Sequence, residues 1–184
     1  EEKIYHRKLL LANPEINRFK ELILYNLEAG EAVLTDNNDI RIYTDGKEKF
    51  RALIEEMRRA GRYIHLQYYI IRNDELWQEI EKVLIEKARE GVEVRVLFDS
   101  MGCRTMHKRD WDRLKSEGIK VAEFFPAILG KLQLRVNYRN HRKIVVIDGR
   151  IGFVGGFNVG REYLGRDPKF GYWRDTHLCI EGAA

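Results

Sequence analysis

The stretch of sequence that decides the fold is NHRKIVVIDGRIGFVGGFN, residues 140–158. Two apolar runs joined by Asp-Gly are typical of a β-hairpin closed by a type I′ turn. The stretch places His141, Lys143 and Asp148 in the spacing H-x-K-x4-D, followed by Gly155, Gly156 and Asn158. An imidazole, a fixed cation and a Gly-Gly-x-Asn turn suit a site that holds and attacks a phosphodiester. Average residue usage would produce this constellation by accident about once in 100,000 chains of this length, or less often. The hairpin is therefore the candidate site.

His141 and Lys143 are separated by one residue at the start of the first apolar run. Strand side chains alternate between faces, so both point to the same side. A lysine this close lowers the pKa of the imidazole and favours its neutral, nucleophilic form. It also neutralises a phosphoryl oxygen lodged between the two groups. The motif thus supplies a nucleophile and a cation for a phosphodiester, and the acid for the leaving group has to come from elsewhere.

The other four motif residues leave alternatives open. Asp148 completes the spacing H-x-K-x4-D and is a candidate catalytic residue, although its place before Gly149 favours a role in the turn. Gly155 and Gly156 let a backbone approach a ligand closely. Asn158 precedes a predicted short helix, VGREYLG. It is either the N-cap of that helix or a donor to a phosphate oxygen, and the two roles are compatible.

Composition and charge are those of a soluble globular protein with a basic region. The chain has 184 residues, 44% of them hydrophobic, and a net charge of +4. Residues 131–175 hold ten Lys/Arg and four Asp/Glu, which suits an anionic ligand; a solvated basic face is the plain alternative. No apolar run approaches the ~20 residues of a membrane-spanning helix. The two cysteines form neither a disulfide framework nor a metal-ligand spacing and fit a reducing, cytosolic setting.

Hydrophobic periodicity and capping signals predict alternating helices and strands. The predicted helices are residues 14–28, 47–60, 74–91 and 107–117, and the predicted strands are 40–43, 62–71, 92–98, 119–125, the two hairpin arms and 173–181. This alternation implies an α/β fold with a largely parallel sheet covered on both faces. We divide the chain into an N-terminal helical segment, residues 1–34, and a catalytic half-domain, residues 35–184. The irregular stretch 126–139 is a candidate substrate loop.

The motif resembles the signature of the phospholipase D superfamily. Three further segments, in this order, resemble the first catalytic half of bacterial cardiolipin synthases: DGKEKFRALIEEMRRAGRYIHLQYYIIRND, GVEVRVLFDSMG and WRDTHLCIEG. The similarity covers roughly residues 35 to 182. It implies a phospholipase D-like α-β-α sandwich, with a mixed, mostly parallel sheet and helices on both faces.

The resemblance also implies a mechanism. Family members bring two such motifs together, from two halves of one chain or from a homodimer. One histidine attacks phosphorus and becomes a phosphohistidine, and the other protonates the leaving alcohol. The lysines and asparagines hold the phosphate, and no metal or other cofactor is needed. His141, Lys143 and Asn158 would be the contribution of this chain.

Asp175 matches the family's acidic residue that hydrogen-bonds the histidine and fixes its tautomer. The alternative for Asp175 is a salt bridge with Arg174 or Arg142. Only one motif is present, and the chain begins with Glu1. We therefore expect either a half of a longer two-motif enzyme or a chain that pairs with itself.

Three functions are compatible with these observations. The leading one is transfer of a phosphatidyl group between two phosphatidylglycerol molecules, with release of glycerol. The parent protein is expected to act at the cytoplasmic side of the cell membrane. The fragment itself is expected to be soluble. The enzyme alternative is a phospholipase D-type phosphodiesterase or nuclease, active as a homodimer. Nucleic acid is disfavoured as a partner because the chain has no obvious base-stacking aromatic ladder. The third is a non-catalytic membrane- or partner-binding module.

Overall fold

The computed structural model describes residues 14–124 and 138–182. The chain divides into two compact units, one up to Asn38 and the other from Asp39 to Gly182. The sequence places this division after residue 34, within the same linking stretch. Most of the candidate substrate loop at 126–139 lies outside the described residues.

The first unit contains two short helices, α2 (Pro14–Asn17) and α3 (Lys20–Gly30). The sequence predicts one helix over 14–28, and the structure interrupts it at Phe19, whose φ of −109° and ψ of 13° leave the helical region. Helix α3 ends where Glu31 adopts the left-handed conformation with a φ of 51°. The helical character of this segment is confirmed, and its continuity is not.

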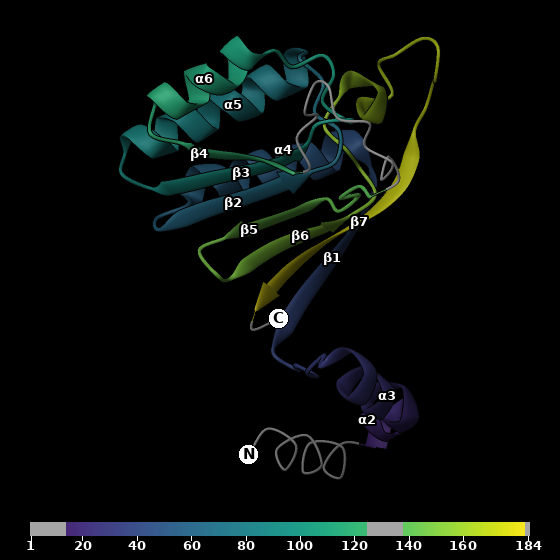
Figure 1. Cartoon of the computed structure of the whole chain (residues 1–184). Helices are drawn as coiled ribbons and strands as arrows, with labels where there is room; N and C mark the ends of the chain where they lie inside the picture. Colours follow the sequence, from purple (N-terminus) through teal and green to yellow (C-terminus); the bar gives the residue numbers. More distant parts are fainter. Residues whose placement is uncertain (1–13, 125–137, 183–184) are drawn as a thin grey trace. The chain divides into compact units, whose positions relative to one another are not determined.

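The second unit is built on a seven-stranded sheet of order β1-β7-β6-β5-β2-β3-β4 (Figure 1). The strands are β1 (Asn38–Asp45), β2 (Tyr63–Tyr68), β3 (Glu93–Asp99), β4 (Lys120–Phe124), β5 (Ile144–Ile147), β6 (Ile151–Gly155) and β7 (Arg174–Gly182). Strands β2, β3 and β4 pair in parallel, whereas the pairs β2–β5, β5–β6 and β6–β7 are antiparallel.

The α/β class and the mixed sheet are confirmed, but the expectation of a mostly parallel sheet is wrong. Among the pairings above, only β2–β3 and β3–β4 are joined by a helical crossover, which is what parallel neighbours require. The hairpin β5–β6 and the return of β7 run antiparallel instead. The motif hairpin therefore lies near the middle of the sheet rather than at its margin.

Local sequence signals set the helices of this unit. They are α4 (Gly46–Arg59), α5 (Glu75–Arg89), α6 (Lys108–Ser116) and the 3-10 helix η1 (Arg161–Leu164). The Asp45 carboxylate accepts two backbone N–H groups in the first turn of α4, and the Asp74 carboxylate does the same for α5. These are the N-caps that the sequence predicts.

The helices cover one face of the sheet. Figure 1 shows α5 and α6 on the same side, and α4 packs against α5. Along β2, Ile64, Leu66 and Tyr68 are buried in the core, while the alternating residues His65 and Gln67 point to the opposite face. None of the helices described in this unit covers that opposite face. The expectation of helices on both faces is therefore wrong for the described part of the chain.

The opposite face carries a groove of about 500 Å³. Its floor is apolar, with Leu97 from β3 and Ile144 and Val146 from β5, and its rim is basic, with Arg95 and Lys120. The central strands of the sheet are thus buried on the helix side, whereas the groove side is half-exposed.

Candidate active site

His141 and Lys143 enter the sheet at the start of β5. Lys143 Nζ lies 2.9 Å from His141 Nδ1 and donates to the carbonyl oxygen of His141 at 2.5 Å. Lys143 is 4% exposed, whereas His141 is exposed to solvent. The amine is therefore fixed beneath an imidazole that faces solvent, and the expected shared side of the two residues is confirmed.

This contact selects a tautomer while Lys143 is protonated. An ammonium group has donors and no acceptor, so Nδ1 of His141 must accept and the ring proton resides on Nε2. In that state the lysine occupies the Nδ1 lone pair, and the protonated Nε2 has none with which to attack phosphorus. The pair thus holds the imidazole in the tautomer that carries its proton on Nε2.

Burial first, and then the Lys143 ammonium, lower the pKa of His141 below its ordinary value, while the negative charge of Asp99 opposes the shift. Burial likewise lowers the pKa of Lys143, and the carboxylate of Asp175 opposes that shift. The predicted effect of the lysine on the imidazole pKa is confirmed in direction, with burial as the larger cause. Both effects favour the neutral form of His141.

We expect His141 to titrate below pH 6.5 in the folded chain, because burial and Lys143 both disfavour the imidazolium. The neutral form, which is the one able to attack, therefore increases as the pH rises through the pKa and is constant above it. A ¹H–¹⁵N NMR titration of the five histidines, with His141→Gln to assign the signal, measures this pKa. In urea the same signal should titrate near about 6.5. A folded midpoint at or above the value in urea would contradict the account.

Two residues that the sequence analysis did not single out complete the surroundings of His141. The Tyr69 ring, directly after β2, lies 4.6 Å from the His141 ring at 48°, and Lys143 Nζ lies 5.6 Å from the centre of the Tyr69 ring. Asp99, the last residue of β3, is 1% exposed and accepts the backbone N–H of Asn140 at 3.0 Å. Both lie at the carboxyl ends of neighbouring parallel strands, where α/β proteins place ligands. That topological rule is the signal that would have found them.

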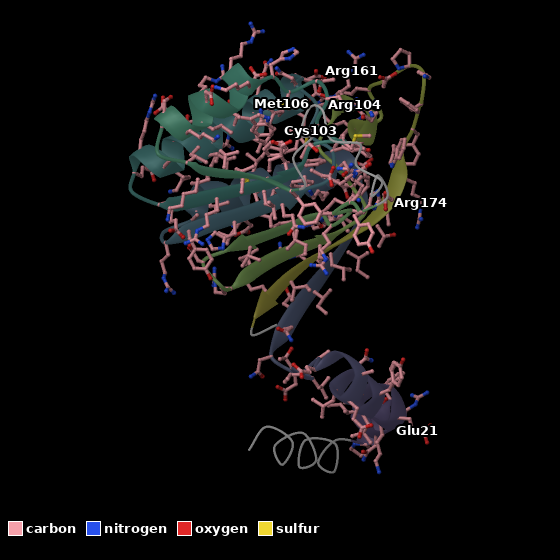
Figure 2. The ribbon with its side chains drawn as sticks, viewed as in Figure 1. Glu21, Cys103, Arg104, Met106, Arg161 and Arg174 are labelled. Carbon is pink, nitrogen blue, oxygen red and sulfur yellow. The ribbon has the colours of Figure 1, made fainter. Side chains whose placement is uncertain are left out.

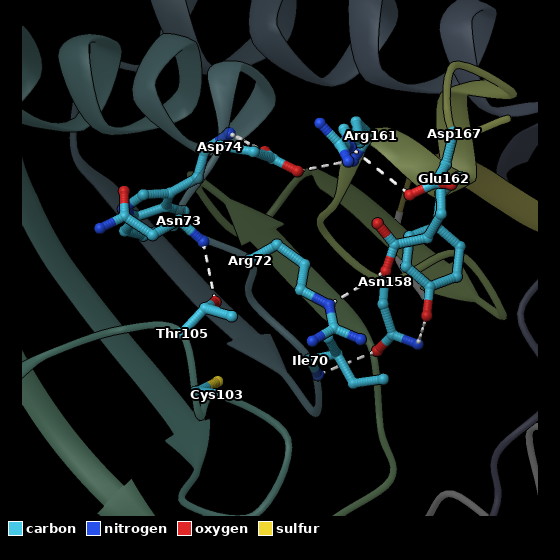
Figure 3. Close-up of polar contacts among 12 residues, drawn as sticks. Ile70, Arg72, Asn73, Asp74, Cys103, Thr105, Asn158, Arg161, Glu162 and Asp167 are labelled. Carbon is cyan, nitrogen blue, oxygen red and sulfur yellow. Dashed lines mark hydrogen bonds and ion pairs between the residues drawn. The ribbon is translucent and has the colours of Figure 1, made fainter. Parts of the chain in front are cut away.

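Asn158 holds the segment that follows β2. It is 5% exposed; its Oδ1 accepts the N–H of Ile70 at 3.1 Å, and its Nδ2 donates to the Tyr163 hydroxyl at 3.0 Å (Figure 3). The residue that caps η1 is Gly160, so the N-cap alternative for Asn158 is wrong. A contact between Asn158 and a phosphate stays a prediction, and it would require one of these amide bonds to open.

Gly155 and Gly156 are required by their packing against β7. A Cβ on Gly155 would overlap the backbone of β7 around Thr176, and a Cβ on Gly156 would overlap the carboxylate of Asp175. The two glycines therefore bring the end of β6 unusually close to its neighbour. Close approach of a ligand, the role expected from the sequence, stays a prediction.

Asp175 lies beside the motif without touching the imidazole. Its Oδ1 accepts the N–H of Thr176 at 2.7 Å, and its charge raises the pKa of Lys143. Within residues 14–124 and 138–182, no hydrogen bond joins Asp175 to His141, and no ion pair joins it to a neighbouring arginine. In this structure its influence on the site passes through the lysine.

Asp148 lies in the hairpin turn, at the opposite end of β5 from the motif lysine. Asp148 and Gly149 have φ values of 57° and 72°, as a type I′ turn requires. The Asp148 carboxylate accepts the backbone N–H groups of Gly61, Arg62 and Tyr63 at 2.8 to 2.9 Å. These contacts favour the structural role for Asp148 over the catalytic one.

We expect Asp148→Ala to lower the free energy of unfolding by about 2–4 kcal/mol, because three backbone donors lose a charged acceptor and alanine disfavours positive φ. Burial alone would raise the pKa of Asp148, but the three hydrogen bonds outweigh it and lower the pKa. This contribution is therefore present above the unfolded pKa of about 3.9 and is lost as the pH falls through the lower folded pKa. Urea denaturation at pH 7 and pH 3 measures both effects. Asp148→Asn, which tolerates the left-handed region and keeps one acceptor, should lose less, and an Ala variant as stable as the parent would contradict the role.

The described part of the chain offers no group of three or more His, Cys, Asp or Glu arranged to hold a metal ion. Among the described helices, none has the length and apolar character needed to cross a membrane.

Cys103 and Cys179 are buried free thiols, and burial raises the pKa of Cys103 to about 12. Cys103, Arg104 and Met106, which are labelled in Figure 2, lie between the end of β3 and the start of α6.

Comparison with known proteins places these features in a family. A family model described as "Cardiolipin synthase, PLD-like domain" matches residues 53–168. The cardiolipin synthase of Staphylococcus aureus (strain N315) is 55% identical over 94% of this chain and 35% of its own length. The major cardiolipin synthase ClsA of Bacillus subtilis (strain 168) is 51% identical over 90% of this chain and 34% of its own length. This chain thus spans about a third of the relatives that it matches.

The fold is also similar to that of a solved structure. The solved structure of the phospholipase D family member Nuc from Salmonella typhimurium aligns with a TM-score of 0.55 and 16% identity, over 79% of this chain and 84% of Nuc. At that identity the likeness concerns the fold alone. The family match over residues 53–168, which is more than half of the sequence, shows that this chain belongs to the phospholipase D-like domains of the cardiolipin synthase family.

Proposed function

We propose that this chain is the first catalytic half of a cardiolipin synthase that transfers a phosphatidyl group from one phosphatidylglycerol to another and releases glycerol. The observation that carries the proposal is the His141–Lys143 pair, in which a solvent-facing imidazole lies 2.9 Å from a buried amine. Relatives that are 51–55% identical over most of this chain bear the name cardiolipin synthase. The basic stretch around the motif suits an anionic phospholipid.

In the proposed reaction, the Lys143 ammonium moves from Nδ1 of His141 to a phosphoryl oxygen of the donor lipid, and His141 attacks phosphorus. A nitrogen–phosphorus bond forms while the bond from phosphorus to the glycerol oxygen breaks. The histidine of a second H-x-K half gives its proton to the departing glycerol. The hydroxyl of the second phosphatidylglycerol then attacks the phosphohistidine, returns a proton to that second histidine and frees His141. Lys143 neutralises the charge on the phosphoryl oxygens throughout.

Other residues take supporting parts in this proposal. Once Lys143 has moved, the ring proton of His141 exchanges through solvent from Nε2 to Nδ1, where Asp175 accepts a hydrogen bond from it, and the Nε2 lone pair is then free to attack. Asn158 and the Gly155–Gly156 turn bind the phosphate. The second half comes from the longer parent chain or from a homodimer mate, and the parent works at the cytoplasmic side of the cell membrane. Neither a metal nor another cofactor takes part in these steps.

Mass spectrometry of the denatured full-length parent, after a brief pulse of phosphatidylglycerol, tests the proposal. The expected result is a phosphatidyl adduct on the peptide that carries His141, together with release of glycerol. An adduct that forms with a phosphodiester of DNA and not with the lipid would favour the nuclease instead. Absence of any histidine adduct, in a parent that still makes cardiolipin, would reject the proposed chemistry. The isolated chain serves as a control: as a monomer it should turn over little or no lipid, because it then lacks the second histidine.

A further inference from the structure

Asp99 anchors the residues that lead into His141. Its Oδ2 accepts the backbone N–H of Asn140 at 3.0 Å, and its Oδ1 accepts the N–H of Met101 at 2.9 Å and lies 3.6 Å from Arg139 Nη1. A carboxylate that is 1% exposed is costly unless its oxygens are satisfied in this way. Asp99 therefore joins the end of β3 to the segment just before the motif, and it brings a negative charge close to the imidazole.

Tyr69 contacts both members of the catalytic pair. Its ring lies against the His141 ring at 4.6 Å, with the Lys143 amine 5.6 Å from the ring centre. The position of Tyr69 is fixed from behind, since Cys103 Sγ donates to its carbonyl oxygen at 3.6 Å. A Cβ at Gly102 would overlap that same carbonyl group. The loop after β3 therefore restrains Tyr69 at its position beside the imidazole.

We propose that Asp99 and Tyr69 are positioning residues for the proposed reaction, and that together they hold the His141 ring in the orientation from which it attacks phosphorus. Tyr69 occupies one face of the ring, Lys143 occupies its Nδ1 edge, and Asp99 fixes the backbone that carries it. The edge bearing Nε2 is left for the substrate. That this orientation serves catalysis rests on the function proposed above. That Asp99 and Tyr69 orient the His141 ring does not depend on it.

Among the residues that the structure describes, the charged and titratable groups around His141 are Lys143, Asp99 and Tyr69, with Asp175 acting through Lys143 and Arg139 through Asp99. Asp99 opposes the lowering of the His141 pKa by Lys143 and by burial. Removing the Asp99 charge should therefore lower the pKa of His141 further. A residue that served only to hold the loop would leave that pKa unchanged in a folded variant.

The first arm of the test uses this chain and needs no lipid. We expect Asp99→Asn to move the NMR titration of His141 to lower pH. We expect Tyr69→Leu to shift the His141 ring signals by loss of the ring current, and Tyr69→Phe to leave them nearly in place. Asp112→Asn is the matched control, since this exposed carboxylate pairs with Lys108 on α6. A folded Asp99→Asn chain with an unaltered His141 pKa, or a Tyr69→Leu chain with unaltered His141 signals, would overturn the proposal.

The second arm uses the full-length parent. Tyr69→Leu should lower kcat by about 10- to 100-fold with KM within about twofold, because misplacement of a reacting group affects the chemical step rather than binding. Tyr69→Phe should restore most of kcat, since the ring rather than the hydroxyl makes the contact. If the parent does not catalyse the proposed lipid reaction, the kinetic effects will be absent while the NMR effects remain. In that case the proposed function is wrong and the positioning of the His141 ring is not. If both Tyr69 variants react like the parent, positioning is refuted even where the phosphatidyl adduct forms.

Discussion

His141→Ala in the full-length parent is expected to abolish phosphatidyl transfer, with a rate at least about 10⁴-fold lower. Among residues 14–124 and 138–182, no other nucleophile lies in its place: the Lys143 amine behind the ring is 4% exposed, and the Tyr69 ring lies against the imidazole. The described part of this half therefore offers no alternative site for the phosphohistidine. The expected signature is loss of both the histidine adduct and the released glycerol, measured by mass spectrometry and by a radiolabel assay.

The matched control is His65→Ala. His65 lies on the groove side of β2, where its Nε2 is 3.2 Å from Glu93, and it takes no part in the proposed chemistry. We expect this variant to keep the adduct and nearly the full rate. Full activity of the His141→Ala parent would remove His141 from the mechanism and with it the assignment of this motif as the nucleophilic half.

Lys143→Met in the same parent is expected to lower kcat by about 10²- to 10³-fold, the range found when one preorganised donor to a developing negative charge is removed. Methionine fills a similar volume without a charge, and burial already lowers the pKa of Lys143. Thermal stability should therefore be nearly retained. The His141 pKa should rise in this variant, since the ammonium that helps to lower it is gone.

Two measurements separate this expectation from simple misfolding. Thermal denaturation gives the melting temperature of the variant, and an NMR titration of this chain carrying Lys143→Met gives the direction of the His141 pKa. Lys82→Met, a substitution at an exposed position of α5, is the matched control and should behave like the parent. A Lys143→Met parent with an undiminished kcat would show that the amine does not stabilise the transition state.

The features that were predictable from the sequence are those encoded locally. Asp45 and Asp74 cap helices because their side chains reach N–H groups two and three residues ahead. Asp148 and Gly149 close the hairpin because a two-residue loop with positive φ fits the twist of the strands. The contact between His141 and Lys143 follows from the alternation of side chains along one strand. Each of these depends on neighbours within a few residues.

The features that were mispredicted depend on partners far along the chain. Strand β2 pairs with β5 in antiparallel register, with Ile64 opposite Ile147, and no local pattern states which edge of β2 receives the hairpin. Asn158 is engaged by the N–H of Ile70, which lies 88 residues earlier, so its sequence neighbours suggested a cap that does not exist. Tyr69 and Asp99 become site residues only because two parallel strands end side by side.

The hydrogen bonds that Asp148 accepts in the hairpin turn have a consequence for the residues at the other end of the strand. A slip of β5 by a single residue would turn both His141 and Lys143 toward the groove side. The carboxylate of Asp148 accepts hydrogen bonds from a loop more than 80 residues away in the sequence. These hydrogen bonds oppose the slip because they fix the register of the strand. Over the seven residues from Asp148 to His141, about 23 Å at the rise of an extended strand, this anchoring fixes the orientation of an imidazole that Asp148 does not contact.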